Sequence, residues 1–354
     1  LTPPHPTPLE KIMTTRAVKH RWSSPAVLGA ALCGILLGLA APSGATGAAP
    51  SPSDAAPTQN WPGTPDGFAS TGGGTTGGAG GETVTVTTFE ELNEYATAAE
   101  PYVIRVGGTI AYDEMGHEVR VASNKTIVGV GTRGEIVGGG FFLNEVSNVI
   151  IRNLTIRDTR MPDDDPGDDD YDYDAIQMDG ADHVWIDHNR LQRMNDGLID
   201  SREDTTDLTV SWNVISENNK TFGIGWTDNV TARMTLHHNW FRDTNSRNPS
   251  IDNVANAHLY NNYLQDTGSG NWSRGSSNTV IENSYFEGVT DPYYITDDAS
   301  LTESGSIVVD SEGDQQTGGE GFDPGRFYDY SLDPAADVPA LLRDGAGPQA
   351  DIGG

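Results

Sequence analysis

Short apolar runs, each followed by polar turn residues, recur along most of the chain. Runs such as Val184–Ile186 and Thr235–His237 fit β-strands. A longer unit also repeats: an aliphatic residue, two variable positions, an Asn, and then an apolar pair or near-pair. The Asn residues of this unit are Asn153, Asn189, Asn213, Asn239, Asn262 and Asn283, so the steps between them are 36, 24, 26, 23 and 21 residues.

Four of these five steps match one coil of a solenoid, and the longest step contains an acidic insertion around residues 163–174. The repeat therefore predicts an all-β fold, a parallel β-helix in which equivalent residues of successive coils stack. We expect each repeated Asn to adopt the left-handed αL conformation and its amide to bond neighbours along the stack. A β-propeller would need blades of about 40–45 residues, and a β-sandwich gives no reason for one Asn to recur.

One helix is expected before the repeats begin. Thr88 is followed three residues later by Glu91, which is the spacing of a capping box at a helix N-terminus. The helix should run to about Ala99 and end before Pro101. A short amphipathic helix at this place could cover the open N-terminal end of the solenoid.

The first residues of the chain have the pattern of an export signal. Met13 is followed by basic residues, then by the apolar run Ala26–Ala40, and then by small residues up to Ala48. We therefore predict an upstream extension and secretory signal peptide in residues 1–48, a flexible Ser/Pro/Ala/Thr-rich linker in 49–64, and a single β-helix domain in 65–354. A membrane anchor fits less well, because the apolar run is short for a bilayer.

The net charge narrows the range of partners. The chain carries 21 Lys and Arg against 51 Asp and Glu, a formal charge of −30, which argues against nucleic acid and anionic membranes as partners. Removal of residues 1–48 leaves 17 basic and 50 acidic residues, or −33, and also removes the one cysteine, Cys33. We expect a secreted, extracellular monomer without disulfides, stabilised by packing and by bound metal.

Four carboxylates are spaced so that the solenoid can bring them together. Asp172 and Asp174 are two residues apart, and Asp196 and Asp200 follow about one coil later. Clustered carboxylates without Cys or His favour Ca²⁺. The alternative is that these residues belong to a solvated acidic loop, as expected in a very acidic protein.

Basic and aromatic side chains lie near the same part of the sequence. Lys220 and Arg247 follow predicted strands on the next coils, although pairing with nearby Asp residues is the commoner role of such cations. His and Trp residues could form a zinc site or a sugar platform, but none has a zinc-ligand spacing, so we expect most of them to stack within the coils. These residues are His183, His188, His237, His238, His258, Trp185, Trp212, Trp226 and Trp240.

Several motifs in one order resemble the pectate lyase family, whose fold is a single-stranded right-handed parallel β-helix. The resemblance extends from about Asp66, with a Gly-rich stretch and the Thr88 helix, to the segment around Asp333. Its motifs are DYDAI from Asp172, VWIDH (184–188), DGLID (196–200), KTFGIG (220–225) with Asp228, HHN (237–239) and RNP (247–249).

The resemblance implies Ca²⁺-dependent cleavage of polygalacturonate, the de-esterified form of pectin, by β-elimination. It implies that Asp174, Asp196 and Asp200 bind calcium, with Asp172 as a further ligand. It also implies that Lys220 contacts a substrate carboxylate and that Arg247 removes the C5 proton. Since a free guanidinium is protonated at ordinary pH, we expect activity to be highest at alkaline pH.

One position departs from the family pattern. The family has a second arginine five residues after the first, and this chain has Asp252 there. Another residue must then bind the substrate, or activity is altered. A non-catalytic β-helical pectin-binding protein, a pectin lyase and a metal-independent polygalacturonase remain as alternatives, and the last would use carboxylates as acid and base.

Overall fold

The computed structural model describes residues 61–162 and 171–354. The predicted signal peptide in residues 1–48, the predicted linker up to residue 60 and the acidic segment 163–170 lie outside these residues. Within the described part, no helix is long and apolar enough to cross a membrane.

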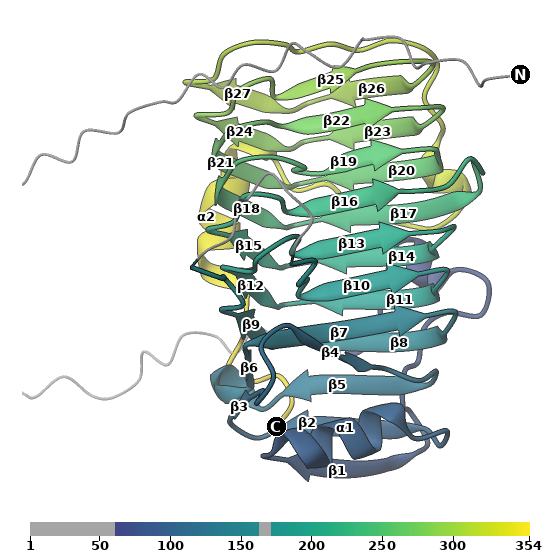
Figure 1. Ribbon diagram of the computed structural model, residues 1–354. Helices are drawn as coiled ribbons and strands as arrows, with labels where there is room; N and C mark the ends of the chain where they lie inside the picture. Colours follow the sequence, from purple (N-terminus) through teal and green to yellow (C-terminus); the bar gives the residue numbers. More distant parts are fainter. Residues whose placement is uncertain (1–60, 163–170) are drawn as a thin grey trace, which may run out of the picture. The chain divides into compact units, whose positions relative to one another are not determined.

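The described chain forms the predicted right-handed parallel β-helix, in which three sheets run along the solenoid (Figure 1). Each coil passes through sheet A, then sheet B, then sheet C, and the named strands pair in parallel with those of the next coil. Sheet A contains β1 (Glu82–Val86), β2 (Tyr102–Val106), β5 (Lys125–Gly129), β8 (Ser147–Arg152), β11 (Asp182–Asp187), β14 (Thr206–Ser211), β17 (Ala232–His237), β20 (Val254–Tyr260), β23 (Asn278–Glu282) and β26 (Ser300–Ser304).

Sheets B and C complete each coil. Sheet B contains β3 (Thr109–Ala111), β6 (Glu135–Val137), β9 (Thr155–Arg157), β12 (Arg190–Gln192), β15 (Val214–Ser216), β18 (Trp240–Thr244), β21 (Tyr263–Thr267), β24 (Tyr285–Glu287) and β27 (Ile307–Val309). Sheet C contains β4 (His117–Arg120), β7 (Gly139–Asn144), β10 (Ile176–Asp179), β13 (Ile199–Arg202), β16 (Phe222–Gly225), β19 (Ser250–Asp252), β22 (Asn271–Arg274) and β25 (Tyr293–Ile295).

The interior is filled by rows of aliphatic side chains that the strand register aligns. One row of sheet A runs through eight coils, and burial of each such side chain contributes roughly 1.5–3 kcal/mol. Its members are all buried: Ile104, Ile127, Ile151, Ile186, Val210, Leu236, Leu259 and Ile281. These rows fix the register, so residues at equivalent positions of successive coils lie side by side on the outer face too.

The asparagine repeat is confirmed in part. Asn189 donates to the side-chain oxygen of Asn213 (3.1 Å), and the same bond continues from Asn213 to Asn239 (3.0 Å) and from Asn239 to Asn262 (3.1 Å). The expectation that these Asn residues adopt the αL conformation is wrong. The positive φ angles belong to the preceding positions, at His188, Trp212, His238 and Asn261.

The first and last repeat units are out of register by one position. The strand pairings align Ile151 with Ile186 and Ile281 with Leu259, so Asn153 and Asn283 fall at the αL position instead of the ladder position. Ser284 then continues the ladder, because its Oγ accepts from the Asn262 backbone N–H at 3.2 Å. The sequence pattern could not separate these two positions because Asn suits both.

In the part of the chain that the structure describes, two α-helices pack on the solenoid. The predicted helix is confirmed as α1 (Phe89–Thr97), with Thr88 as N-cap accepting from the Glu91 backbone N–H at 3.3 Å. Its Leu92 and Ala96 are buried in the main core at the N-terminal end, near β2 and β4 (Figure 1). A second helix, α2 (Val338–Gly345), was not predicted and packs through Leu342 on the outside of sheet B.

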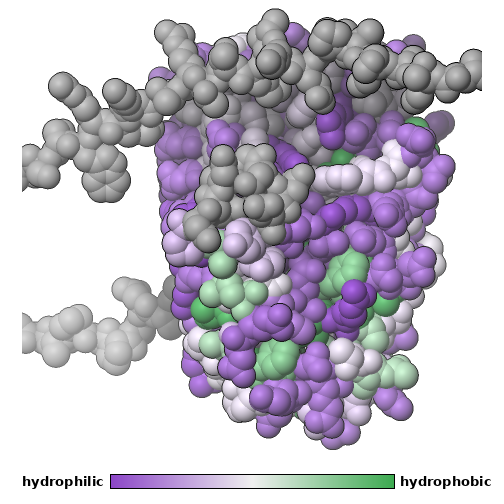
Figure 2. All heavy atoms as spheres, in the orientation of Figure 1, coloured by the Kyte–Doolittle hydropathy of each residue, from purple (hydrophilic) through white to green (hydrophobic). Residues whose placement is uncertain are grey.

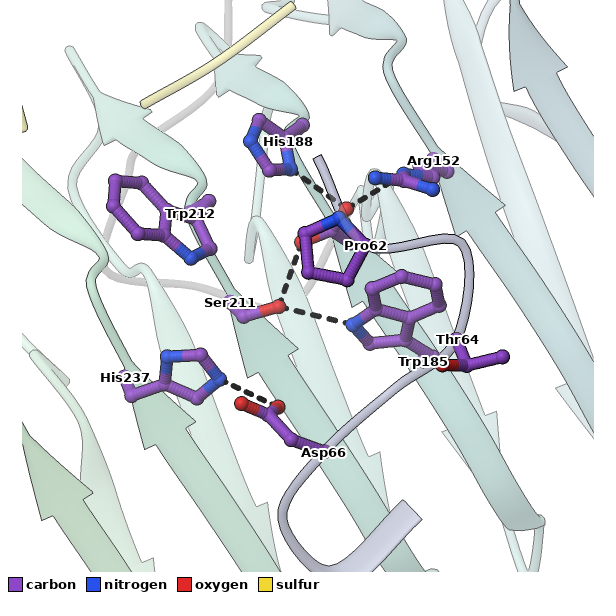
Figure 3. A pocket seen from close by; sticks show the side chains of 10 residues that line it. Pro62, Thr64, Asp66, Arg152, Trp185, His188, Ser211, Trp212 and His237 are labelled. Atoms are coloured by element: carbon purple, nitrogen blue, oxygen red, sulfur yellow. Dashed lines mark hydrogen bonds and ion pairs between the residues drawn. The ribbon is translucent and has the colours of Figure 1, made fainter. Parts of the chain in front are cut away.

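The residues just before the predicted domain start already contact sheet A. The Trp61 ring lies 4.3 Å from His188 and 4.9 Å from Trp212, measured between ring centroids. A cavity of about 60 Å³ lies between this segment and sheet A (Figure 3). Residues 61–64, which the sequence analysis assigned to a linker, therefore include residues that contact the solenoid.

The polar residues in this cavity form a structural network. Asp187 accepts from Ser211 Oγ at 2.7 Å, contacts His188 Nδ1 at 2.6 Å, and pairs with Arg152 Nε at 2.7 Å (Figure 3). Ser, His and Asp are the residue types of a nucleophilic triad, but here the serine donates to the aspartate and not to the histidine, so it is not activated. We interpret this network as the anchor of the N-terminal segment on sheet A.

Candidate active site

The predicted site residues gather where the chain enters the strands of sheet C. Asp172 and Asp174 precede β10, Asp196 precedes β13, Lys220 precedes β16, and Arg247 precedes β19. These positions belong to turns that lead from sheet B into sheet C on successive coils. The parallel stacking therefore brings together residues up to 75 positions apart in the sequence, counted from 172 to 247.

Three of the four predicted carboxylates form a compact cluster. Asp172, Asp174 and Asp196 each offer an oxygen, and these oxygens all lie within 4.8 Å of one another. Asp174 is buried, and its Oδ1 accepts from the Gly197 backbone N–H at 2.6 Å. Asp200, on β13, is also buried and lies beside this group without being one of its members.

Arg202 was not predicted, and it occupies the centre of the carboxylates. Its Nη2 lies 3.2 Å from Asp172 Oδ2 and 3.3 Å from Asp174 Oδ2, while its Nε lies 3.4 Å from Asp200 Oδ2. Two residues after Asp200 on the same strand, it faces the same side of sheet C. The period of two along a strand could have identified it once Asp200 was singled out.

Burial raises the pKa values of the two buried carboxylates of this site, Asp174 and Asp200. Burial, followed by the charges of Asp200, Asp172 and Asp196, raises the pKa of Asp174 well above its ordinary value. Burial raises the pKa of Asp200 to about 7, although Arg202 and Arg247 oppose this shift. A cation bound between these groups would favour their charged forms.

Glu118 is a further acidic residue that the sequence did not indicate. It lies on β4, and burial, followed by the charge of Asp172, raises its pKa to about 8. Its Oε1 is buried without a hydrogen-bond partner. It precedes Asp172 by 54 positions, and only the coil-to-coil register brings it near the cluster.

The two predicted cations lie next to the carboxylates. Lys220 Nζ forms an ion pair with Asp196. Arg247 Nη1 lies 4.0 Å from Asp200 Oδ1, and its side chain is 29% exposed, so it can contact a molecule bound at this surface. The sequence analysis gave pairing with nearby Asp residues as the commoner role of such cations, and both cations do lie beside an Asp in this structure.

Most of the His and Trp residues stack within the coils, as expected. Trp212 lies between His188 and His238, at centroid distances of 5.8 and 4.4 Å, and His237 stacks on Tyr260 at 4.7 Å. Trp226 is the exception, because 48% of it is exposed and its ring lies beside Arg202 and Arg247. For Trp226 the expectation of stacking within the coils is wrong.

A guanidinium does lie next to Asp252. The register aligns Asp252 on β19 with Arg274 on β22, and Arg274 Nη2 is 3.3 Å from Asp252 Oδ2. Arg274 also lies over the ring of Trp272, with 4.7 Å from its Cζ to the ring centroid. The next coil thus carries an arginine beside the position where the family pattern has one.

The donor set fits a hard divalent cation. Asp172, Asp174 and Asp196 supply oxygen atoms within reach of one ion, and the buried Asp200 Oδ1 has no hydrogen-bond partner. Oxygen ligands of this kind suit Ca²⁺, whereas zinc sites use Cys and His. Lys220 and Arg247 add positive charge at the edge of the cluster, where an anionic ligand could bind.

Gly197 offers a direct test of the cluster geometry. A Cβ at this position would lie 2.7 Å from Asp174 Oδ1 and 2.9 Å from Asp200 Oδ1. We therefore expect Gly197→Ala to displace both carboxylates and to weaken Ca²⁺ binding by about 10–100-fold, the range seen when groups that orient metal ligands are changed. Calorimetric titration with Ca²⁺ measures this effect.

Gly108→Ala is the matched control, since no atom lies within 4 Å of its added Cβ. It should bind Ca²⁺ as the parent protein does. Equal Ca²⁺ affinity in the two alanine variants would show that the geometry around Gly197 is not that of the metal site.

Comparison with known proteins gives the class to which this β-helical protein belongs. The pectate lyase family model matches residues 54–336. A pectate trisaccharide-lyase of Bacillus licheniformis is 36% identical over 302 residues, covering 79% of this chain and 85% of the relative. One of Thermotoga maritima is 34% identical over 320 residues, covering 77% of this chain and 84% of the relative.

A solved structure agrees with these relatives. The pectate lyase of Bacillus sp. N165, in complex with trigalacturonate, superposes with a TM-score of 0.67 and 28% identity, covering 80% of this chain and 98% of that one. The chain belongs to the pectate lyase family and is a pectate lyase.

Proposed function

We propose that this pectate lyase is exported and cleaves polygalacturonate by calcium-dependent β-elimination, which leaves a 4,5-unsaturated end. The observation that carries the proposal is the meeting of three carboxylates within 4.8 Å with Lys220 and Arg247 on adjacent coils. The trigalacturonate bound by the related Bacillus enzyme supports a uronate as ligand. Export rests on the signal pattern in residues 1–48.

Asp172, Asp174, Asp196 and Asp200 would hold the calcium ion. Bound there, Ca²⁺ would act as a Lewis acid on the uronate carboxylate and would reconcile a polyanionic substrate with a protein of charge −30. Gly197 and Arg202 orient these carboxylates, through the hydrogen bond and ion pairs described above. The Asp residues are assigned to the ion because carboxylate oxygens are the ligands that Ca²⁺ prefers, whereas the N–H groups of Gly197 and Arg202 can only donate to those carboxylates.

Lys220 and Arg247 act on the sugar itself. The C5 hydrogen of a uronate is α to a carboxylate, so its removal leaves negative charge that a nearby cation stabilises. Lys220 supplies that charge, and Arg247 in its deprotonated form, which alkaline pH favours, accepts the proton from C5. The C5–H electron pair forms the C4–C5 double bond as the C4–O4 bond breaks, and the O4 oxygen leaves with the departing chain and takes up a proton from solvent water.

The masses of the products test this function. Elimination gives one fragment with the same mass as in hydrolysis and one fragment, with the unsaturated end, that is lighter by one water. We expect the lighter series to appear from polygalacturonate in the presence of Ca²⁺. The heavier series alone would instead support a polygalacturonase, and unchanged substrate with tight Ca²⁺-dependent binding would support a non-catalytic pectin-binding protein.

Arg274 replaces the substrate contact that Asp252 cannot make. Its guanidinium lies beside Asp252, and charged hydrogen bonds to a carboxylate are worth roughly 1.5–3 kcal/mol. We expect Arg274→Ala to raise KM about tenfold or more, since 1.4 kcal/mol is a factor of ten, with a smaller change in kcat. Steady-state kinetics on polygalacturonate measure both.

Arg343→Ala is the control for lost positive charge, because Arg343 lies on α2 and contacts Tyr263 of sheet B. It should leave KM unchanged. If Arg274→Ala also leaves KM unchanged, another residue compensates for Asp252.

The chain surface supports action as a monomer. The face seen in Figure 2 is mainly hydrophilic, with small separate apolar patches. The large hydrophobic side chains exposed in the described residues are Met115, Trp226, Val230, Phe327 and Leu332. Sedimentation analysis of the purified protein tests this state.

A further inference from the structure

Trp226 lies beside Arg202 and Arg247 of the candidate site and is about half exposed. It follows β16, and 48% of it is exposed, whereas Trp185 is 3% exposed. An exposed indole gains little from burial, and large apolar side chains at the surface often serve an interaction. The position of this ring among the site residues therefore calls for a functional explanation.

The local backbone is adapted to this ring. Trp226 has a φ of 56°, in the left-handed region that disfavours bulky residues. The ring folds back over Gly223, where an added Cβ would lie 2.4 Å from the Trp226 Cη2. The φ angle is shared with other turn residues such as Trp212, whereas the absence of a side chain at Gly223 is what leaves room for this ring.

Two arginines from neighbouring coils share this ring. The Cζ atoms of Arg202, on the preceding coil, and Arg247, on the following coil, each lie 5.4 Å from the centroid of the Trp226 ring. Guanidinium groups are attracted to the faces of aromatic rings at such distances. The indole is therefore a neutral partner for both guanidiniums.

Arg247 is held less closely by carboxylates than most paired arginines in the described part of the chain. Its nearest acidic oxygen, on Asp200, is 4.0 Å away, whereas Arg202 and Arg274 have one at 3.2 and 3.3 Å. Arg242 has the same 4.0 Å contact, to Glu217, and it too lies over a tryptophan, Trp240. Arg202 and Arg274 also lie over tryptophan rings, so the longer carboxylate contact of Arg247 reflects its own position beside Trp226 and Asp200.

We propose that Trp226 is a positioning residue that holds the Arg247 guanidinium away from Asp200, where it can act on a bound substrate. Without the indole, attraction in this partly buried site would draw Arg247 onto Asp200. Arg247 would then be out of reach of C5. This inference rests on the proposed function, in which Arg247 acts on the substrate, and it adds a residue that the family resemblance does not assign.

Three substitutions of Trp226 separate a positioning role from simple bulk. Trp226→Phe keeps an aromatic face, Trp226→Leu keeps apolar bulk, and Trp226→Ala removes both. Since misplacement of a reacting group by about 1 Å costs roughly 100-fold in rate, we expect kcat to fall by 10- to 100-fold in the Leu and Ala variants. KM should change little, and the Phe variant should recover most of the activity.

Trp240→Ala is the matched control, because Trp240 has the same relation to Arg242 but lies on sheet B. It should keep the parent kcat when compared at a temperature where both proteins are folded. A crystal structure of Trp226→Leu should show Arg247 closer to Asp200 than 4.0 Å. If the Ala variant does not fold, the comparison of Phe with Leu decides the question.

Two kinds of failure can be told apart. If the parent protein forms unsaturated products and Trp226→Leu keeps its kcat, the positioning role is wrong while the proposed function stands. Equal loss in the Phe and Leu variants would also overturn it, because the aromatic face would then be irrelevant. If the parent protein forms no unsaturated product, the proposed function itself fails.

Discussion

Replacement of Arg247 by lysine is expected to abolish measurable turnover while oligogalacturonate still binds. A general base typically contributes about 10²–10⁴-fold to the rate, and lysine places its single nitrogen differently from the planar guanidinium. Asp172, Asp174, Asp196 and Lys220 remain in place, so the carboxylate contacts of the ligand should persist. Absorbance kinetics and calorimetric binding to the same oligosaccharide measure the two effects.

Arg242→Lys is the control for this change, because Arg242 also lies over a tryptophan but belongs to sheet B. It should retain turnover. An Arg247→Lys variant with near-normal kcat would remove Arg247 from the base role and would direct attention to Lys220.

Removal of calcium is expected to abolish activity and to make the fold sensitive to alkaline pH. Asp200 has its pKa raised to about 7, and Glu118 to about 8, mainly by burial. Groups whose pKa is raised in the folded state bind protons more tightly there than in the unfolded chain. The contribution of these two groups to stability without metal is therefore full at low pH and is lost as the pH rises between about 4 and 8.

Bound calcium should instead stabilise the folded protein more strongly as the pH rises. The ion and the protons compete for the same carboxylates, so the affinity for Ca²⁺ should rise as the pH increases through about 7. Melting temperatures in EDTA and in excess Ca²⁺, measured from pH 5 to 9, test both statements. A gap between the two curves that stays constant with pH would contradict the proposed linkage between these carboxylates and the metal.

Much of the fold could be predicted from the sequence because one coil has a nearly constant length. The repeated Asn marked the turns, and the Thr88–Glu91 spacing marked α1. The exact turn position could not be predicted, since Asn is suitable both for the αL position and for the ladder. Helix α2 lacks a capping bond from its N-cap side chain and gave no such signal.

The acidic part of the site was also predictable, because Asp172, Asp174 and Asp196 are spaced by two residues and by about one coil. The missed residues depend on the register between distant strands. Glu118 reaches the cluster from β4, and Arg274 reaches Asp252 from the next coil. Trp226 was among the aromatic candidates, but its exposed place beside Arg202 and Arg247 could not be predicted, because tryptophan is usually largely buried.

The central claim is that the carboxylates, Lys220 and Arg247 form a calcium-dependent elimination site. It is tested most directly by the ultraviolet absorbance of polygalacturonate incubated with the purified protein, in Ca²⁺ and in EDTA, from neutral pH to about pH 10. We predict that absorbance from a double bond conjugated to a carboxylate rises in Ca²⁺, most steeply at alkaline pH, and does not rise in EDTA. An equal rise in EDTA, or no rise in Ca²⁺ at any pH, would contradict the account.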